Sequence, residues 1–209
     1  MSSKAYTKFI KSIKRCEELA KTYTILAEAR KQNQQIPAPK DIVRASATLS
    51  VAALDAYITD VFTEYLVPYL KKYKTDASLI ELLSDAGLDT REALNLLSMD
   101  RPYRRIRTLV SKYYSSYTTQ RFDVIDKLFL PYRLNKITDN AQNMSGRKSL
   151  KSSVQKLISR RHEIVHAGDY NAHGKIKNIN EKQIETRIKD LEILVNNIDN
   201  IISNRMRNL

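Results

Sequence analysis

The run from Arg160 to His166 carries the side chains of this sequence that are best suited to chemistry. It reads Arg-Arg-His-Glu-Ile-Val-His, so the guanidinium of Arg161 precedes the imidazole of His166 by five positions. Metal-independent cleavage of RNA uses the neighbouring 2′-hydroxyl as nucleophile and needs a proton acceptor, a proton donor and a cation beside the phosphate oxygens. Imidazole exchanges protons near neutral pH, and guanidinium stays charged and grips phosphate with a planar fork. The run therefore predicts a metal-independent endoribonuclease that leaves 2′,3′-cyclic phosphate and 5′-hydroxyl ends.

Helical geometry separates the two groups. Five residues of helix turn through about 500°, so Arg161 and His166 point about 140° apart. His162 lies one turn before His166 and nearly in line with it, which makes it a candidate second proton-transfer group. A second subunit is the other possible source of that group. In the purely structural alternative, Arg161 pairs with Glu163 or Asp169, and His166 caps a nearby carbonyl.

The stretch from His162 to His166 also matches the zinc-binding pattern His-Glu-x-x-His, in which the glutamate activates water. A third ligand is hard to find, because His173 stands seven residues after His166 and only Glu181 and Glu185 remain as candidates. The two arginines directly before the first histidine repel a metal dication. A zinc hydrolase is therefore a minor alternative, and we expect no metal and no other cofactor.

The elements around this run are expected to be helices. Glycine and proline are scarce, at 4 and 5 residues, and apolar residues recur at helical spacing. Residues 1–33 predict one long helix, followed by a short connector. A second long helix, capped by Asp41 and rich in small residues, is expected at the centre of a bundle. Pro68 should bend or end it near Val67. Short helices should begin at Asp76 and at Asp89 or the next residue.

The last third predicts two further helices. One runs from about Arg147 to Gly168, so the candidate run lies late on it or across a helix junction. The other begins at Asn180, with Gln183 three residues on in a capping-box arrangement. The chain is thus expected to be all-α, an up-and-down helical bundle with additional short helices in its middle third, forming one domain over residues 1–209.

Arg161, four residues and then His166, with a polar residue directly behind the arginine, follow a long buried helix that contains Asp55. This layout resembles the HEPN superfamily of RNases and RNA-binding domains, most closely the prokaryotic stand-alone proteins of the RiboL-PSP-HEPN and MAE_28990 type. The resemblance covers roughly Asp41 to Arg207, with residues 1–33 as an N-terminal helix. It implies a HEPN-type bundle and a two-fold homodimer in which both motifs line one cleft.

The same resemblance implies a biological setting. A ribonuclease of this kind is expected to be a defence or toxin–antitoxin effector, restrained by an antitoxin or another regulatory protein. The alternative keeps the fold without catalysis, as an RNA- or nucleotide-binding module. Tyr170 resembles the tyrosine that some HEPN toxins carry behind their histidine and that a partner nucleotidyltransferase modifies, although the spacing differs here.

Several residues are expected to support the site. Asp55 sits on an otherwise apolar helix and needs a partner if it is buried; Arg44, the motif arginine or a backbone donor can serve. We interpret Asp55 first as structural and second as a residue that orients the active-site arginine or histidine. Arg160 and Glu163, inside the run itself, are further supporting residues.

The net charge of +13, from 36 Lys and Arg against 23 Asp and Glu, makes RNA the first partner to consider, because a positive field attracts polyanions. One basic segment, residues 101–117, interleaves cations with tyrosines, the last of which is Tyr117. This composition suits phosphate contacts and base stacking. Alternatively its tyrosines belong to the core or a dimer interface. Lysines and arginines between residues 147 and 160, on the same predicted helix as the candidate run, could extend this positively charged surface toward the site. The predicted RNA-binding residues are Arg104, Arg105, Arg107, Lys112, Tyr113, Tyr114 and Lys156.

Composition also bears on location. The hydrophobic fraction is 42% and no apolar run approaches the roughly 20 residues of a membrane span, so we expect no membrane partner. The first residues lack the apolar stretch of a secretory signal, which favours the cytoplasm. The single cysteine, Cys16, excludes an internal disulfide, and its place on an apolar helix face predicts a buried, unreactive thiol.

Overall fold

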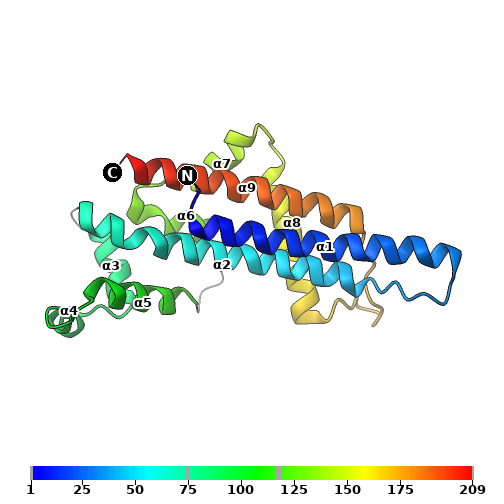
Figure 1. The fold of residues 1–209 in the computed structure, drawn as a ribbon, viewed down its shortest axis with the longest axis horizontal. Helices are drawn as coiled ribbons and strands as arrows, with labels where there is room; N and C mark the ends of the chain where they lie inside the picture. The colour runs from blue at the N-terminus through cyan, green and yellow to red at the C-terminus, as the bar shows by residue number, and fades with distance from the viewer. Residues whose placement is uncertain (1, 74–75, 116–118, 209) are drawn as a thin grey trace.

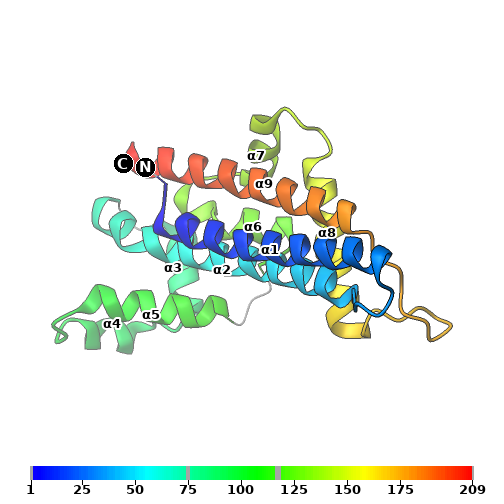
Figure 2. The same cartoon turned by 45° about the vertical axis from the view of Figure 1, so that its right-hand side comes forward.

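Three long helices form the body of the protein. The structure, a computed structural model, describes residues 2–73, 76–115 and 119–208. Helices α1 (Lys4–Gln32), α2 (Asp41–Lys72) and α9 (Glu181–Arg207) pack against one another along the long axis (Figure 1). Helix α1 runs antiparallel to both others, and the two chain ends lie at the same end of the bundle (Figure 2).

Shorter helices connect α2 to α9. Helices α5 and α8 both pack on α2, and α7 and α8 pack on α9. Within the described residues, the one β-type pairing is an isolated bridge between Tyr170 and Ile176, so the predicted all-α fold is confirmed. The connecting elements are α3 (Ala77–Asp85), α4 (Thr90–Leu96), α5 (Pro102–Ser115), α6 (Phe122–Leu128), the 3₁₀ turn η1 (Leu130–Tyr132), α7 (Ile137–Ser145) and α8 (Leu150–Ala167).

Helix α2 is the centre of the core, as its composition predicted. It contacts α1, α5, α8 and α9, and Leu54, Tyr57 and Phe62 are fully enclosed. Burying one such side chain stabilises the fold by about 1.5–3 kcal/mol. By length and composition alone, α2 is the one helix of the described chain that could cross a membrane, but 56% of its most apolar stretch is buried inside the bundle. Its packing therefore accounts for its apolar character.

Helix α2 does not end near Val67 as expected, and it continues through Pro68 to Lys72. The proline is exposed, whereas the next residue, Tyr69, is buried against Tyr132 with ring centroids 4.9 Å apart. Packing of this last turn thus outweighs the backbone hydrogen bond that proline cannot donate.

The helix starts follow the predicted caps in all but one case. Asp76, Asp89 and Asn180 each accept a hydrogen bond from a backbone N–H three residues later. The prediction that Asp41 caps α2 is wrong, because the residue before it already has helical backbone angles. Asp41 is instead the first helical residue, and its carboxylate lies 3.4 Å from the guanidinium of Arg44.

Cys16 lies on the buried face of α1, with 1% of its surface exposed. Its carbonyl accepts a hydrogen bond from the Ser46 hydroxyl at 2.8 Å, which joins α1 to α2. Burial raises the pKa of the Cys16 thiol to about 11. The thiol therefore stays protonated at neutral pH, and its predicted burial is confirmed.

Candidate active site on helix α8

The run from Arg160 to His166 occupies the last turns of α8. This helix begins at Leu150, a few residues later than expected, and it is unbroken to Ala167. Gly168 ends it with a φ of 58°, in the left-handed region that glycine adopts without penalty. The run therefore lies on one helix and does not cross a junction.

A buried carboxylate fixes this end of α8 against α2. Asp169 is 1% exposed, and its Oδ2 accepts a hydrogen bond from the Nε of Arg44 on α2 at 2.6 Å. Its Oδ1 lies 2.5 Å from Nη1 of Arg160, which also pairs with Glu163 at 2.9 Å. The hydrogen bond from Arg160, with a weaker one from the following loop, holds the pKa of Glu163 below its usual value. The pairings that the structural alternative gave to Arg161 thus belong to Arg160.

The loop after α8 folds back as a short hairpin. The backbone N–H of Lys177 donates to the carbonyl of Asp169 at 2.8 Å, and Tyr170 bridges to Ile176. The ring of Tyr170 lies over the backbone of Gly168, yet the residue is 53% exposed. The predicted modification site is therefore accessible, directly behind the helix that carries the histidines.

Arg161 has no such partner. It is half-buried, its Nε is shielded from solvent and makes no hydrogen bond, and no ion pair reaches it from the described residues. It faces Asp55 of α2 closely enough for its charge to lower the pKa of that carboxyl. A buried donor without an acceptor costs about 1–3 kcal/mol, so the site holds a cation with unsatisfied hydrogen-bonding capacity.

Asp55 is held by two side chains that the sequence analysis missed. The Thr119 hydroxyl donates to Oδ1 at 3.0 Å, and the Gln120 amide donates to Oδ2. Burial raises the pKa of Asp55, although these hydrogen bonds and the facing arginine act in the opposite direction. Arg44, which the sequence offered as a partner, pairs with the other buried carboxylate. The sequence indicated only that a half-buried Asp55 needs hydrogen-bond donors, and it did not indicate that Thr119 and Gln120 supply them.

His162 and His166 lie side by side on the exposed face of α8. Their ring centroids are 4.4 Å apart, at an interplanar angle of 43°. Neither imidazole makes a hydrogen bond to the residues that the structure describes, so His166 does not cap a carbonyl there. Among those residues, no group of three or more His, Cys, Asp or Glu side chains is placed to hold a metal ion. Both rings are thus open to a ligand.

The sequence model of the RiboL-PSP-HEPN family matches residues 10–204, from α1 to α9. The chain belongs to this HEPN family. HEPN domains are often RNases, so membership supports an RNA-related role of a nuclease kind. The predicted recognition is confirmed, and the match includes most of α1. No curated protein and no solved structure matches the chain significantly.

The basic segment of this HEPN domain that was predicted to bind RNA is α5, and its members differ in exposure. Tyr114 is buried against Phe62, with centroids 5.3 Å apart, which leaves no free ring face for a base. It is thus a core residue, the alternative that the sequence left open. Tyr113 is half-buried, and Arg105 pairs with Glu92 at 2.5 Å. Tyr117 lies outside the described residues; the exposed cations of α5 include Arg104, Arg107 and Lys112.

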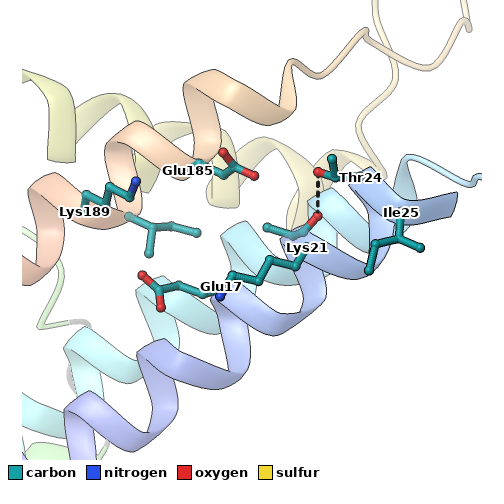
Figure 3. A pocket seen from close by; sticks show the side chains of 8 residues that line it. Glu17, Lys21, Thr24, Ile25, Glu185 and Lys189 are labelled. Carbon is teal, nitrogen blue, oxygen red and sulfur yellow. Dashed lines mark hydrogen bonds between the residues drawn. The ribbon is translucent and has the colours of Figure 1, made fainter. Parts of the chain in front are cut away.

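A hollow of about 520 Å³ between α1 and α9 is lined by none of these residues (Figure 3). Glu17 and Lys21 from α1 and Glu185 and Lys189 from α9 surround it. Its two cations and two carboxylates balance, so it attracts a polyanion no more than a polycation.

Replacing Asp169 with Asn should destabilise the HEPN domain. Asparagine keeps the size and tolerates the left-handed backbone, but two buried guanidinium groups lose their shared counter-charge. Breaking a buried ion pair from one side costs about 3–5 kcal/mol, so urea unfolding should show a lower midpoint. Asp123→Asn, which removes the exposed partner of Arg121, is the matched control and should leave the curve unchanged. A similarly small effect of both changes would contradict the role given to Asp169.

Replacing Asp55 with Asn should raise stability at neutral pH. The folded pKa of Asp55 lies above its unfolded value of about 3.9, so the folded state binds this proton more tightly. That stabilisation is complete below the unfolded pKa and is lost as pH rises through the folded pKa. The free energy of unfolding of Asp55→Asn minus that of the wild type should therefore increase with pH above about 4. Urea unfolding at several pH values measures it; a difference that falls with pH would contradict the argument.

Proposed function

We propose that this HEPN domain is a metal-independent endoribonuclease that yields 2′,3′-cyclic phosphate and 5′-hydroxyl ends. The observation that carries the proposal is that Arg161, whose guanidinium has no ion-pair partner among the described residues, shares one helix with the exposed imidazole pair of His162 and His166. An arginine with two close carboxylates, like Arg160, would have no capacity for phosphate. Arg161 retains that capacity because the acids near the end of α8 are already engaged.

The chemistry follows from these groups. The Arg161 fork binds the non-bridging oxygens, where negative charge builds as the 2′-oxygen attacks phosphorus. One imidazole accepts the proton of the 2′-hydroxyl, and a second, protonated imidazole donates to the leaving 5′-oxygen. The bond from the 2′-oxygen to phosphorus forms, the bond to the 5′-oxygen breaks, and water is not consumed. His166 is one of the two groups, and His162 or the same imidazole of a second subunit is the other.

Asp55 is a positioning residue in this scheme. Its carboxylate faces Arg161 and is itself fixed by Thr119 and Gln120, so it orients the guanidinium without closing it off by a direct ion pair. Arg160 contributes indirectly, because its ion pair with Asp169 holds the end of α8 in place.

A homodimer is part of the proposal, and an exposed apolar face on α2 supports it. The face flanks Asp55, and its Leu49 is 44% exposed although α2 is the core helix of the bundle. Val165 of α8, four residues after Arg161, is 47% exposed. Small side chains let two helices approach closely, and pairing here brings the arginine of one subunit toward the imidazoles of the other. The members of this face are Ala45, Leu49, Ala52 and Ala56.

The proposed setting is a cytoplasmic defence or toxin–antitoxin effector. A nuclease that reads RNA mainly through charge endangers its own cell, so an antitoxin or another regulatory protein is a required partner. Exposed Tyr170, directly behind α8, is the proposed modification site. A phosphate-containing group there would add negative charge directly after the helix that carries the histidines and repel the substrate.

Cleavage should survive a chelator and depend on the named residues. Purified protein and mixed RNA with EDTA should give cyclic phosphate ends, identified by mass spectrometry. His166→Ala should lower the rate by about 10²–10⁴, as expected for a lost proton-transfer group, and Arg161→Gln by about 10²–10³. His173→Ala removes an exposed loop imidazole and serves as the matched control. RNA binding without product would favour the non-catalytic module, and stoichiometric zinc with inhibition by EDTA would favour the zinc hydrolase.

Leu49→Glu should convert the dimer to monomers and lower cleavage, because a desolvated carboxylate in a helix pair is costly. Light scattering after size-exclusion chromatography measures the mass, and the same fractions are assayed on RNA. Ile25→Glu, at a 68% exposed position of α1, is the control and should change neither. A mixture of Arg161→Gln and His166→Ala proteins should regain activity through mixed dimers where His162 is the second proton-transfer group, and should stay inactive where the His166 of both subunits is required. A Leu49→Glu monomer with full activity would exclude the shared cleft.

A further inference from the structure

A polar groove lies along the flank of α8 that faces α9. Two adjoining hollows of about 430 and 340 Å³ share the lining residues Ser152, Lys156 and Arg187, and the first extends toward Lys182 at the start of α9. We call these two hollows together the α8–α9 groove. Its lining contains five cations and two carboxylates, in contrast to the balanced hollow between α1 and α9.

The carboxylates neutralise only part of this charge. Asp190 is 2% exposed and pairs with Arg147 at 2.5 Å, and Glu163 pairs with Arg160 at 2.9 Å. The groove therefore retains a net charge of +3. In the described part of the chain, no carboxylate pairs with its other cations, which are Lys156, Lys182 and Arg187.

The lining chemistry selects a phosphate backbone over bases. Serine hydroxyls stand among the cations, and hydroxyl and charged N–H donors are the groups that proteins use for phosphate and sugar oxygens. Aromatic side chains, which bind bases by stacking, are absent from the lining of both hollows. Contacts of this kind hold a strand without reading its sequence. The lining serines are Ser149, Ser152, Ser153 and Ser159.

The groove and the imidazoles adjoin on the same helix. Each residue turns the helix by about 100°, so Arg161 lies about 100° to one side of His162 and Lys156 about 120° to the other. Ser159, from the groove lining, lies between Lys156 and His162. A strand held in the groove can thus pass over the two histidines toward the unpaired guanidinium.

We propose that the α8–α9 groove binds the sugar–phosphate backbone of single-stranded RNA and carries the strand to His162 and His166. The proposal rests on the proposed ribonuclease function and deepens it, because it adds Lys182 and Arg187 of α9 to a binding track that the sequence analysis placed on α5 and α8. A single strand is required, since the reacting 2′-oxygen and phosphorus have to rotate into line.

The test removes two unpaired cations. In the His166→Ala protein, which leaves RNA intact, Lys156→Gln with Arg187→Gln should weaken binding of a labelled single-stranded RNA homopolymer roughly tenfold. The slope of log K against log salt should fall by about 1.4, the value for two contacts to a single strand. Lys21→Gln with Lys189→Gln removes the same charge from the balanced hollow of Figure 3 and should leave affinity and slope unchanged. Fluorescence anisotropy over a salt series gives both quantities.

The outcomes separate the groove from the catalytic proposal. With His166 present, the groove variant should lose kcat/KM on long RNA but not on a dinucleotide, which is too short to occupy both the groove and the imidazoles. Unchanged affinity and slope, or an equal loss in the Lys21 and Lys189 control, would overturn the groove even if the dinucleotide is cleaved. Loss of binding in the groove variant of a protein that cleaves nothing would retain the groove and overturn the nuclease. Thermal unfolding checks folding, and Lys182→Gln with Arg187→Gln is the second variant.

Discussion

Two guanidinium groups that leave water together must share whatever counter-charge the fold provides, and here that is the buried carboxylate of Asp169. Arg44 from α2 and Arg160 from α8 both pair with it, and both contact its Oδ2. Removing the carboxylate would leave both guanidinium groups without their shared buried counter-charge. The pair thereby fixes both the position and the rotation of the last turns of α8. Because neighbouring residues differ by about 100° on a helix, that rotation also decides where Arg161 points.

Asp55 shows the converse arrangement, a carboxylate held near a cation without a direct ion pair. Its raised pKa means that the ionised group costs stability, and its hydrogen bonds from Thr119 and Gln120 offset only part of that cost. An apolar residue would suit the core side of α2 better. A destabilising charged group of this kind is expected where a side chain serves chemistry, because function and stability then place opposite demands on one position. The cost is local, since α2 remains enclosed around it.

Much of the fold could be predicted from local signals, whereas the pairings could not. The caps at Asp76, Asp89 and Asn180 need only a few neighbouring residues, and so does the end of α8 at Gly168. Which of two adjacent arginines meets Asp169 depends on how α8 is rotated against α2, and no local pattern contains that information. The burial of Tyr114 depends likewise on Phe62, far away in the sequence.

The wrong prediction at Pro68 has the same origin on a smaller scale. Proline disfavours a continuing helix because it lacks the N–H of one local hydrogen bond, but the burial of Tyr69 against Tyr132 decides the outcome. For the candidate site, the types of the reacting groups can be read directly from the sequence, and helix periodicity gives the angles between them. It could not supply Thr119, Gln120, Lys182 or Arg187, which only the packing of other segments brings alongside α2 and α8.

In the proposed mechanism, the divergence of arginine and histidine on α8 links activity to dimer formation. A single helix cannot aim Arg161 and His166 at one phosphate without the guanidinium reaching around, since the two point about 140° apart. In the proposed homodimer, a second subunit on the exposed α2 face would remove that constraint and cover the apolar surface at the same time. Association follows mass action, so the proposed nuclease gains activity with concentration and loses it when another protein occupies the same face. A regulatory partner therefore need not reach the histidines; competition for Leu49 and its neighbours is sufficient to separate the reacting groups.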